Sequence, residues 1–354
     1  MTDSSLKKMW IGGQAVDGDA GVAPLVSVNP ATGEVNYEVA AAGAKAADTA
    51  VRVADEAARD KKWRNMLPPA RAAILSRIAD GMERRSEELA RLQMIENGKV
   101  WRECQTQVKS AAATFRYYAA VCETTGSEVT PARGDYLSMS VYEPYGVVAA
   151  ITPWNSPMTM EAQKVAPALA AGNAVILKPS EITPSTGLLL AEIAQEAGLP
   201  PGILNVLPGT GQQVGAALVE HPRVRMVSFT GGTESGRRIA ETAARKLMPV
   251  ALELGGKSPH IVFNDAPVDS AVAALAGGIF EGSGQSCVAG SRAFVQRGVY
   301  DEVVAKLSAV ARSLKVDLPD AAGAEMGPLA TFAHRDKVAA MVEAARAAGA
   351  DILA

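Results

Sequence analysis

The sequence predicts an α/β protein in which helices cover both faces of a mainly parallel sheet. From about residue 147 onward, short apolar runs alternate with amphipathic stretches, separated by turns that contain Gly or Pro. Elements that alternate in this way form parallel sheets, because each helix returns the chain to the start of the next strand. The composition agrees, since 48% of residues are hydrophobic and 21% are charged. A chain of 354 residues usually exceeds one core, which predicts two domains.

The N-terminal part predicts a small β region followed by helices. Residues 25–40 hold two valine-rich runs around the turn residues Asn29-Pro30-Ala31-Thr32-Gly33. Helices are expected at 44–60, 69–96 and 99–121. The second of these carries apolar side chains at helical spacing and opens with Pro68-Pro69, and proline suits a first helical turn. The stretch 136–152 alternates and then turns wholly apolar, which predicts an antiparallel arm near 130–145 that leads into a buried strand.

The remaining chain predicts the alternating units. Strands are expected near 174–178, 203–207, 225–229, 249–253, 259–263 and 291–296. Helices are expected near 158–171, 183–197, 211–220, 233–247, 267–281, 299–313 and 331–348. The last residues, 351–354, read as the start of a further strand. We therefore expect the chain to end while a βα unit is being completed.

Charge, cysteine content and hydropathy exclude several classes of function. The net charge is −3, and no basic block with interleaved aromatics suggests nucleic acid. No apolar run is long enough to span a bilayer, and the N-terminus lacks the apolar core of a signal peptide. Cys104, Cys122 and Cys287 are an odd set without framework spacing, which favours a reduced, cytoplasmic setting. The three histidines are far apart, so a metal site is not expected.

Two glycine-rich turns and one charged turn are candidates for binding phosphate and ribose. The first, 209–215, is GxGxxxG, one residue longer than the dinucleotide fingerprint. The second, 229–236, follows a strand and opens a helix, whose unpaired N–H groups attract phosphate. The third, Lys178-Pro179-Ser180-Glu181, ends a strand, where ligands of open α/β sheets gather. Each could equally be an ordinary βα turn.

Three side chains are candidates for catalysis. Cys287 lies among small residues, and a thiolate is the best side-chain nucleophile near neutral pH, although most cysteines are buried apolar residues, as we expect for Cys104 and Cys122. Glu253 interrupts an apolar run, where a carboxylate is costly unless it is paired or functional, so it is either a general base or a partner of nearby groups. Asn155 follows a buried strand and could stabilise an oxyanion, or simply form a turn.

Together these segments resemble the aldehyde dehydrogenase superfamily over the whole chain. The resemblance rests chiefly on Thr152-Pro153-Trp154-Asn155, Lys178-Pro179-Ser180-Glu181, Phe229-Thr230-Gly231 to Gly236, Leu252-Glu253-Leu254-Gly255-Gly256-Lys257 and Gly284-Gln285-Ser286-Cys287. Their order also fits the family, as does the separation of 34 residues between Glu253 and Cys287. Motifs that are weak singly become specific in this combination.

The resemblance implies an aldehyde dehydrogenase-like α/β fold with two domains and a defined role for each site residue. Residues 1–253 would form a Rossmann-type cofactor domain with the arm used for oligomerisation, and 254–354 an incomplete catalytic domain. Cys287 would attack the aldehyde, Asn155 would hold the oxyanion, Glu253 would activate water, and Lys164 would lie near the site with a less defined role. The product would be a carboxylic acid, released from a cysteine thioester. A homodimer or homotetramer would be the family-type assembly, and the partner would be a small aldehyde.

The resemblance also implies a nicotinamide cofactor. The residues expected to contact it are Ile151, Thr152, Trp154, Lys178, Ser180, Glu181, Gly211, Gly215, Phe229, Thr230, Gly231, Gly232, Thr233, Gly236, Leu254 and Gly255. A carboxylate at Glu181 would repel a 2′-phosphate, so NAD is favoured over NADP.

The sequence departs from the family at its C-terminal end. Family members continue through a Glu-x-Phe-Gly-Pro segment, more of the catalytic sheet and a strand that pairs between subunits. We therefore expect a truncated chain with uncovered apolar surface and impaired folding or activity. Two alternatives remain: a non-catalytic NAD-binding remnant, and a thiol esterase that uses Cys287 without cofactor.

Overall fold

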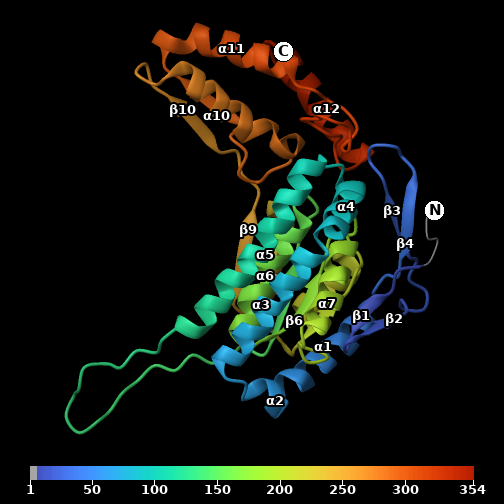
Figure 1. The fold of residues 1–354 in the computed structure, drawn as a ribbon, viewed down its shortest axis with the longest axis vertical. Helices are drawn as coiled ribbons and strands as arrows, with labels where there is room; N and C mark the ends of the chain where they lie inside the picture. Colours follow the sequence, from blue (N-terminus) through green and yellow to red (C-terminus); the bar gives the residue numbers. More distant parts are fainter. Residues whose placement is uncertain (1–5) are drawn as a thin grey trace.

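The central feature of the protein is a seven-stranded sheet, seen in a computed structural model that describes residues 6–354 (Figure 1). Its strands are β1 (Met9–Ile11), β2 (Gln14–Val16), β5 (Val147–Ile151), β6 (Ala174–Lys178), β7 (Leu204–Val206), β8 (Val224–Gly231) and β9 (Val250–Leu254). They lie in the order β2-β1-β7-β6-β5-β8-β9. The five strands from β7 to β9 are parallel, and β1 joins β7 antiparallel. The α/β class predicted from the alternating pattern is confirmed.

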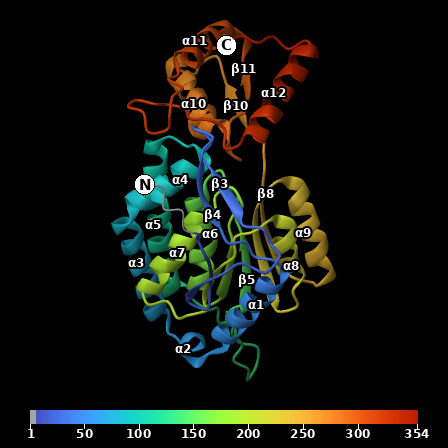
Figure 2. The same cartoon turned by 90° about the vertical axis from the view of Figure 1, so that its right-hand side faces the viewer.

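Helices cover both faces of this sheet. Figure 2 shows α6 (Pro157–Ala170) and α7 (Ser185–Glu196), backed by α3 (Pro68–Arg84) and α5 (Trp101–Thr124), on one face. The other face carries α1 (Ala44–Arg59), α8 (Ala216–Glu220) and α9 (Thr233–Arg245). Burial on both faces explains why β5 and β6 read as unbroken apolar runs, and every residue of both strands is buried.

Smaller elements complete this part of the chain. They are β3 (Leu25–Val28), paired antiparallel with β4 (Val35–Val39), and the helices α2 (Lys61–Arg64), α4 (Ser86–Asn97) and η1 (Gly211–Gly215). The expected helix 69–96 is two helices, α3 and α4, which meet at Arg85. The expected helix 211–220 begins as the π-helix η1 and continues as α8.

A second, smaller group of strands and helices follows β9. It holds the parallel strands β10 (Pro259–Val262) and β11 (Arg292–Val295), with α10 (Val268–Phe280), η2 (Glu281–Gly284), η3 (Arg297–Val299), α11 (Tyr300–Ser313) and α12 (Phe332–Ala347). A small core of Val262, Val272, Leu275 and Val303 joins β10 to α10 and α11. The opposite face is open, because the register partners Ile261 and Phe294 are 63% and 53% exposed. The uncovered apolar surface expected from the sequence is therefore present.

Residues 126–145 contain one antiparallel bridge, Val129 with Met139, and no strand, so the role of this arm in assembly stays a prediction. The strand expected at 351–354 is wrong, since these residues are exposed and form no ladder. The predicted division at residue 253 also stays a prediction; β9 ends at Leu254 and β10 begins at Pro259. Within the described residues, no helix is long and apolar enough to cross a membrane.

Candidate active site

The carboxyl ends of four parallel strands bring most of the predicted site residues to one edge of the sheet. Ile151 at the end of β5 lies in register with Lys178 on one side and Phe229 on the other. Thr230, the next residue of β8, is the register partner of Glu253 on β9. Parallel strands therefore place the four sequence motifs side by side, although long stretches of chain separate them.

The loop after β5 carries the candidate oxyanion donor. The backbone N–H of Thr152 donates to the Lys178 carbonyl at 3.1 Å, and the Asn97 carboxamide donates to the Trp154 carbonyl at 3.3 Å. Held at both points, the loop directs the Asn155 side chain to the carbonyl of Gln285 at 2.7 Å. Asn155 thus contacts the segment that carries Cys287, as its predicted role requires.

Cys287 lies in a loop that is fixed from two sides. Cys287 is partly exposed, whereas Cys104 and Cys122 are buried in the core, as predicted. The Gln285 side chain accepts from the backbone N–H of Ala330 at 2.9 Å. On the other side, a Cβ placed on Gly256 would lie 3.1 Å from the Cys287 carbonyl oxygen. The loop after Glu253 therefore packs directly against the backbone of Cys287, and glycine permits that approach.

Lys164 and Glu253 occupy the same face of the sheet. The Lys164 ammonium, on α6, donates to the Ser228 hydroxyl at 3.1 Å, and Ser228 and Thr230 point to the same side of β8. Burial lowers the pKa of Lys164 to about 8, and the charge of Glu253 opposes that shift. The expected burial of Glu253 among apolar neighbours is wrong. Its neighbours on β9 alternate, so Leu252 and Leu254 are half-buried while Glu253 projects into open space.

The end of β8 and the start of α9 form an open cradle. Gly232 precedes α9 without a side-chain cap, so the first helical N–H groups are free of that competition, and nothing lies within 4 Å of a Cβ built on it. A Cβ on Gly236 would meet the Leu254 side chain at 2.5 Å, so glycine lets α9 pack closely on β9. The hydroxyls of Thr152 and Thr230 are buried without a hydrogen-bond partner in the described chain. The uncapped N–H groups of α9 fit a phosphorylated ligand, and the orphaned hydroxyls fit a polar ligand at the same edge of the sheet.

The end of β6 presents an ion pair. The buried Lys178 ammonium donates to the Pro179 carbonyl at 3.0 Å and to the Glu181 carboxylate at 3.3 Å. Burial lowers the pKa of Lys178, and Glu181 opposes the shift. Ser180 is buried and its hydroxyl accepts from the N–H of Ile182, while about half of the Glu181 side chain stays exposed. A carboxylate in this position can still accept hydrogen bonds from a ligand's hydroxyls.

The remaining predicted cofactor contacts are less informative. Gly211 and Gly215 lie in η1, and no atom stands within 4 Å of a Cβ built on either. Gly255 and Thr233 likewise lie at the cradle's rim without a distinguishing contact. Residues 6–354 contain no group of three or more His, Cys, Asp or Glu side chains placed to hold a metal ion.

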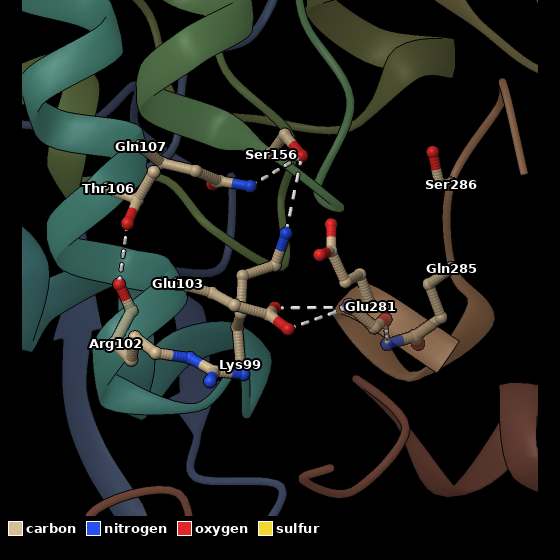
Figure 3. A pocket seen from close by; sticks show the side chains of 10 residues that line it. Lys99, Arg102, Glu103, Thr106, Gln107, Ser156, Glu281, Gln285 and Ser286 are labelled. Carbon is tan, nitrogen blue, oxygen red and sulfur yellow. Dashed lines mark hydrogen bonds between the residues drawn. The ribbon is translucent and has the colours of Figure 1, made fainter. Parts of the chain in front are cut away.

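Sequence reasoning missed a cavity of about 330 Å³ beside the Cys287 loop. It lies between the start of α5, Ser156, and the segment 281–286 (Figure 3). Gly98 ends α4 with φ 76°, and this left-handed turn brings Lys99 to the cavity. The available signal was Glu103 and Gln107, which lie four residues apart and so share one side of α5, with Lys99 shortly before that helix.

Known proteins resemble this chain over nearly its whole length. Residues 16–354 match the Aldehyde dehydrogenase family. (Z)-2-((N-methylformamido)methylene)-5-hydroxybutyrolactone dehydrogenase of Acinetobacter baylyi is 40% identical over 347 residues, which cover 98% of this chain and 70% of that protein. The NAD⁺ complex of an aldehyde dehydrogenase from Bacillus cereus superposes with a TM-score of 0.97 at 36% identity, covering 99% of this chain and 71% of that one.

A third match has a different cofactor in its description. An NADP-dependent enzyme from E. coli superposes with a TM-score of 0.96 at 35% identity, covering all of this chain and 73% of that one. The chain thus spans about 70% of the length of these relatives. The family match and the likeness over almost the whole chain show that this chain belongs to the aldehyde dehydrogenase family.

Proposed function

We propose that this protein oxidises an aldehyde to a carboxylic acid with NAD, and that Cys287 is the nucleophile. The observation that carries the proposal is the convergence on one loop: Asn155 bonds to Gln285, and Gly256 packs against Cys287. Two segments distant in sequence, each with a suitable polar group, therefore flank the only cysteine outside the core.

The first step is addition of the Cys287 thiolate to the aldehyde carbon, which forms a C–S bond and places negative charge on the former carbonyl oxygen. One N–H of the Asn155 carboxamide is used by Gln285, and the second is free to donate to that oxygen. The backbone N–H of Cys287 is the natural second donor. Donors fixed before the reaction stabilise the developing charge without reorganising.

A bound nicotinamide would accept the hydride that leaves this carbon, so that Cys287 is left as a thioester. Glu253 then takes a proton from a water molecule, whose oxygen attacks the thioester and releases the acid and the thiolate. The open position of Glu253 on β9 gives its carboxylate access to water. Lys164, on the same face, balances its charge.

NAD is proposed as the cofactor because of Glu181. The carboxylate would accept hydrogen bonds from the ribose hydroxyls with Lys178 as its partner, and it would repel a 2′-phosphate. The cradle at Gly231 and Gly232 would receive the pyrophosphate at the start of α9. The orphaned hydroxyls of Thr152 and Thr230 support a ligand at this edge.

The test is formation of reduced cofactor from NAD by the purified chain with aliphatic, aromatic and semialdehyde substrates. Cys287→Ala is expected to abolish it, with a loss of at least about 1,000-fold, whereas Cys122→Ala, in the core, keeps it. Ester hydrolysis is followed in parallel without cofactor. Turnover of esters with no reduction of NAD by any aldehyde would show a thiol esterase instead and refute the proposal.

A further inference from the structure

The cavity beside Cys287 is lined by hydrophilic residues throughout. Its walls come from the start of α5, from Ser156 after β5, and from the segment that runs from Glu281 to Ser286 (Figure 3). Every described residue that lines it has a polar or charged side chain, or is glycine. A cavity of this kind gains nothing by enclosing an apolar chain, because the ligand would strip water from the walls without replacing their hydrogen bonds.

Lys99 is the most confined charge of the cavity. Only 9% of the residue is exposed, and its ammonium lies 3.4 Å from the Ser156 hydroxyl. Burial lowers its pKa, and the charges of Glu103 and Glu281 oppose that shift, although neither carboxylate forms an ion pair with it among residues 6–354. An ammonium carries three donors, so two of them lack a protein acceptor. A buried cation in this condition is stabilised by an oxygen atom supplied by a ligand.

Gln107 adds an acceptor next to this donor. Its carboxamide nitrogen donates to the Ser156 hydroxyl at 3.1 Å, while its carboxamide oxygen is buried without a partner. Lys99 and Gln107 thus share Ser156 and both keep unused hydrogen-bonding capacity. A buried polar atom without a partner in the protein points to a partner that the ligand brings.

The two glutamates of the cavity differ in what they already bind. Both oxygens of Glu103 accept from the Gly282 N–H, at 3.0 and 3.2 Å, so that side chain holds the loop. Glu281 projects toward the centre of the cavity (Figure 3), and its negative charge, after that of Glu103, favours the charged form of Lys99. The walls therefore do not present a bare positive field, and they match a ligand that both accepts and donates hydrogen bonds.

We propose that this cavity selects aldehydes that carry a further oxygen group, a hydroxyl or a carboxylate, in preference to apolar aldehydes of the same length. Lys99 would donate to either group, and the free carboxamide oxygen of Gln107 would accept from a hydroxyl. The inference rests on the proposed function, because the cavity acts on specificity only if the aldehyde reacts at Cys287. Lys99 and Gln107 are specificity residues in this scheme, since neither bonds to the reacting carbon.

Two readouts test the inference with the same four aldehydes: butanal, 3-hydroxybutanal, 4-oxobutanoate and the cationic trimethylammonioacetaldehyde. The first readout is protection of Cys287 from alkylation by iodoacetamide without cofactor, followed by intact mass. The second is kcat/KM with NAD. A hydrogen bond from a charged donor is worth enough for a preference of about 10-fold or more for an oxygenated aldehyde over butanal.

The variants Lys99→Met and Gln107→Leu keep the approximate size of each side chain and remove its hydrogen bonds. Lys99→Met is expected to reduce the ratio of either oxygenated aldehyde to butanal toward one in both readouts. Gln107→Leu should do so only for 3-hydroxybutanal, because a carboxamide oxygen cannot bond to a carboxylate. Lys109→Met, on the exposed side of α5, is the matched control and should leave the ratio unchanged. If either variant fails to fold, the other still decides the outcome.

The possible results distinguish failure of this inference from failure of the proposed function. A larger preference for 4-oxobutanoate identifies a carboxylate, and a larger preference for 3-hydroxybutanal identifies a hydroxyl; both support the inference. A preference for butanal or for the cationic aldehyde, or a preference that survives both variants, overturns it while the proposed function stands. Absence of protection and of turnover with every aldehyde would overturn the proposed function, and this inference with it.

Discussion

The side-chain amide nitrogen of Asn155 lies 2.7 Å from the carbonyl oxygen of Gln285, across 130 residues of sequence. This bond joins the loop after β5 to the loop of Cys287, so the position of Cys287 depends on a strand end in the main sheet. An amide nitrogen has two N–H groups, and one remains for the substrate. The same side chain therefore orients the loop and can stabilise the oxyanion.

Removing this amide should affect the rate more than substrate binding. Asn155→Ala is expected to lower kcat by about 100-fold or more, the effect typical of a lost oxyanion donor, with a smaller change in KM. Asn155→Asp keeps the shape but cannot donate, so steady-state kinetics should show a similar loss. Full activity in Asn155→Asp would show that the amide serves neither purpose.

The low pKa of Lys164 should appear in the pH dependence of stability. Its pKa is lowered from 10.5 to about 8 because the ammonium is buried. Between these values the unfolded chain binds more protons than the folded one, so the free energy of unfolding rises with pH through this window. Below pH 8 the full cost of the buried charge is present, up to about 3 kcal/mol at 1.36 kcal/mol per unit.

The measurement is urea unfolding of wild type and Lys164→Met at several pH values. The variant should be the more stable protein below pH 8, and its advantage should shrink as the pH approaches 10.5. Subtraction of the two curves cancels the other groups that titrate in this range. A difference that does not vary with pH would contradict a lowered pKa at Lys164.

Cofactor choice should depend on Glu181. Replacing it by Gln removes the charge that would repel a 2′-phosphate, while keeping a group that can bond to a hydroxyl. The ratio of kcat/KM for NADP to that for NAD is expected to rise by about 10-fold, roughly the effect of 1.4 kcal/mol. Glu241→Gln, an exposed change on α9, is the control. An unchanged ratio would place the discrimination elsewhere.

The sequence predicted the sheet well because buried strands have a distinctive pattern. The unbroken apolar runs of β5 and β6 marked both strands within a residue of their observed ends. The exposure of Glu253 could not be predicted in the same way. Apolar neighbours suggested a buried strand, but Glu253 lies on a strand at the sheet's edge, and both Ala251 and Glu253 on one face of that strand are exposed. Burial there depends on tertiary cover, which the local pattern does not contain.

The site was predictable where motifs lie at strand ends, and not where separate segments meet. Asn155, Glu253 and Cys287 each belong to a motif, so each could be named from the sequence. The cavity around Lys99 arises because α5 and the segment after α10 come together, with Glu103 bonding to Gly282 across 179 residues. Nothing in either segment alone indicates the other. The sequence likewise does not show that Gly278 on α10 packs against His260 of β10.

Two adjacent glycines of α10 should respond in opposite ways to alanine. A Cβ on Gly278 would lie 2.8 Å from the imidazole nitrogen Nε2 of His260, whereas nothing stands within 4 Å of a Cβ on Gly277. Alanine favours a helix over glycine by about 1 kcal/mol. Gly277→Ala should therefore raise the free energy of unfolding by about 0.5–1 kcal/mol. Gly278→Ala should lower it by about 1–3 kcal/mol, because the ring must shift in a packed setting.

The pair controls for helix propensity, since both changes are identical and neighbouring. Chemical denaturation gives the two values, and the double variant His260→Ala with Gly278→Ala tests the cause. If the His260 ring is the obstacle, Gly278→Ala should be far less damaging when His260 is already alanine.

Gly290, which follows the Cys287 loop, packs against the same ring. Activity of Gly278→Ala should therefore fall together with its stability, because a displaced ring presses on the loop of the nucleophile; equal stability of the two glycine variants would rule this out.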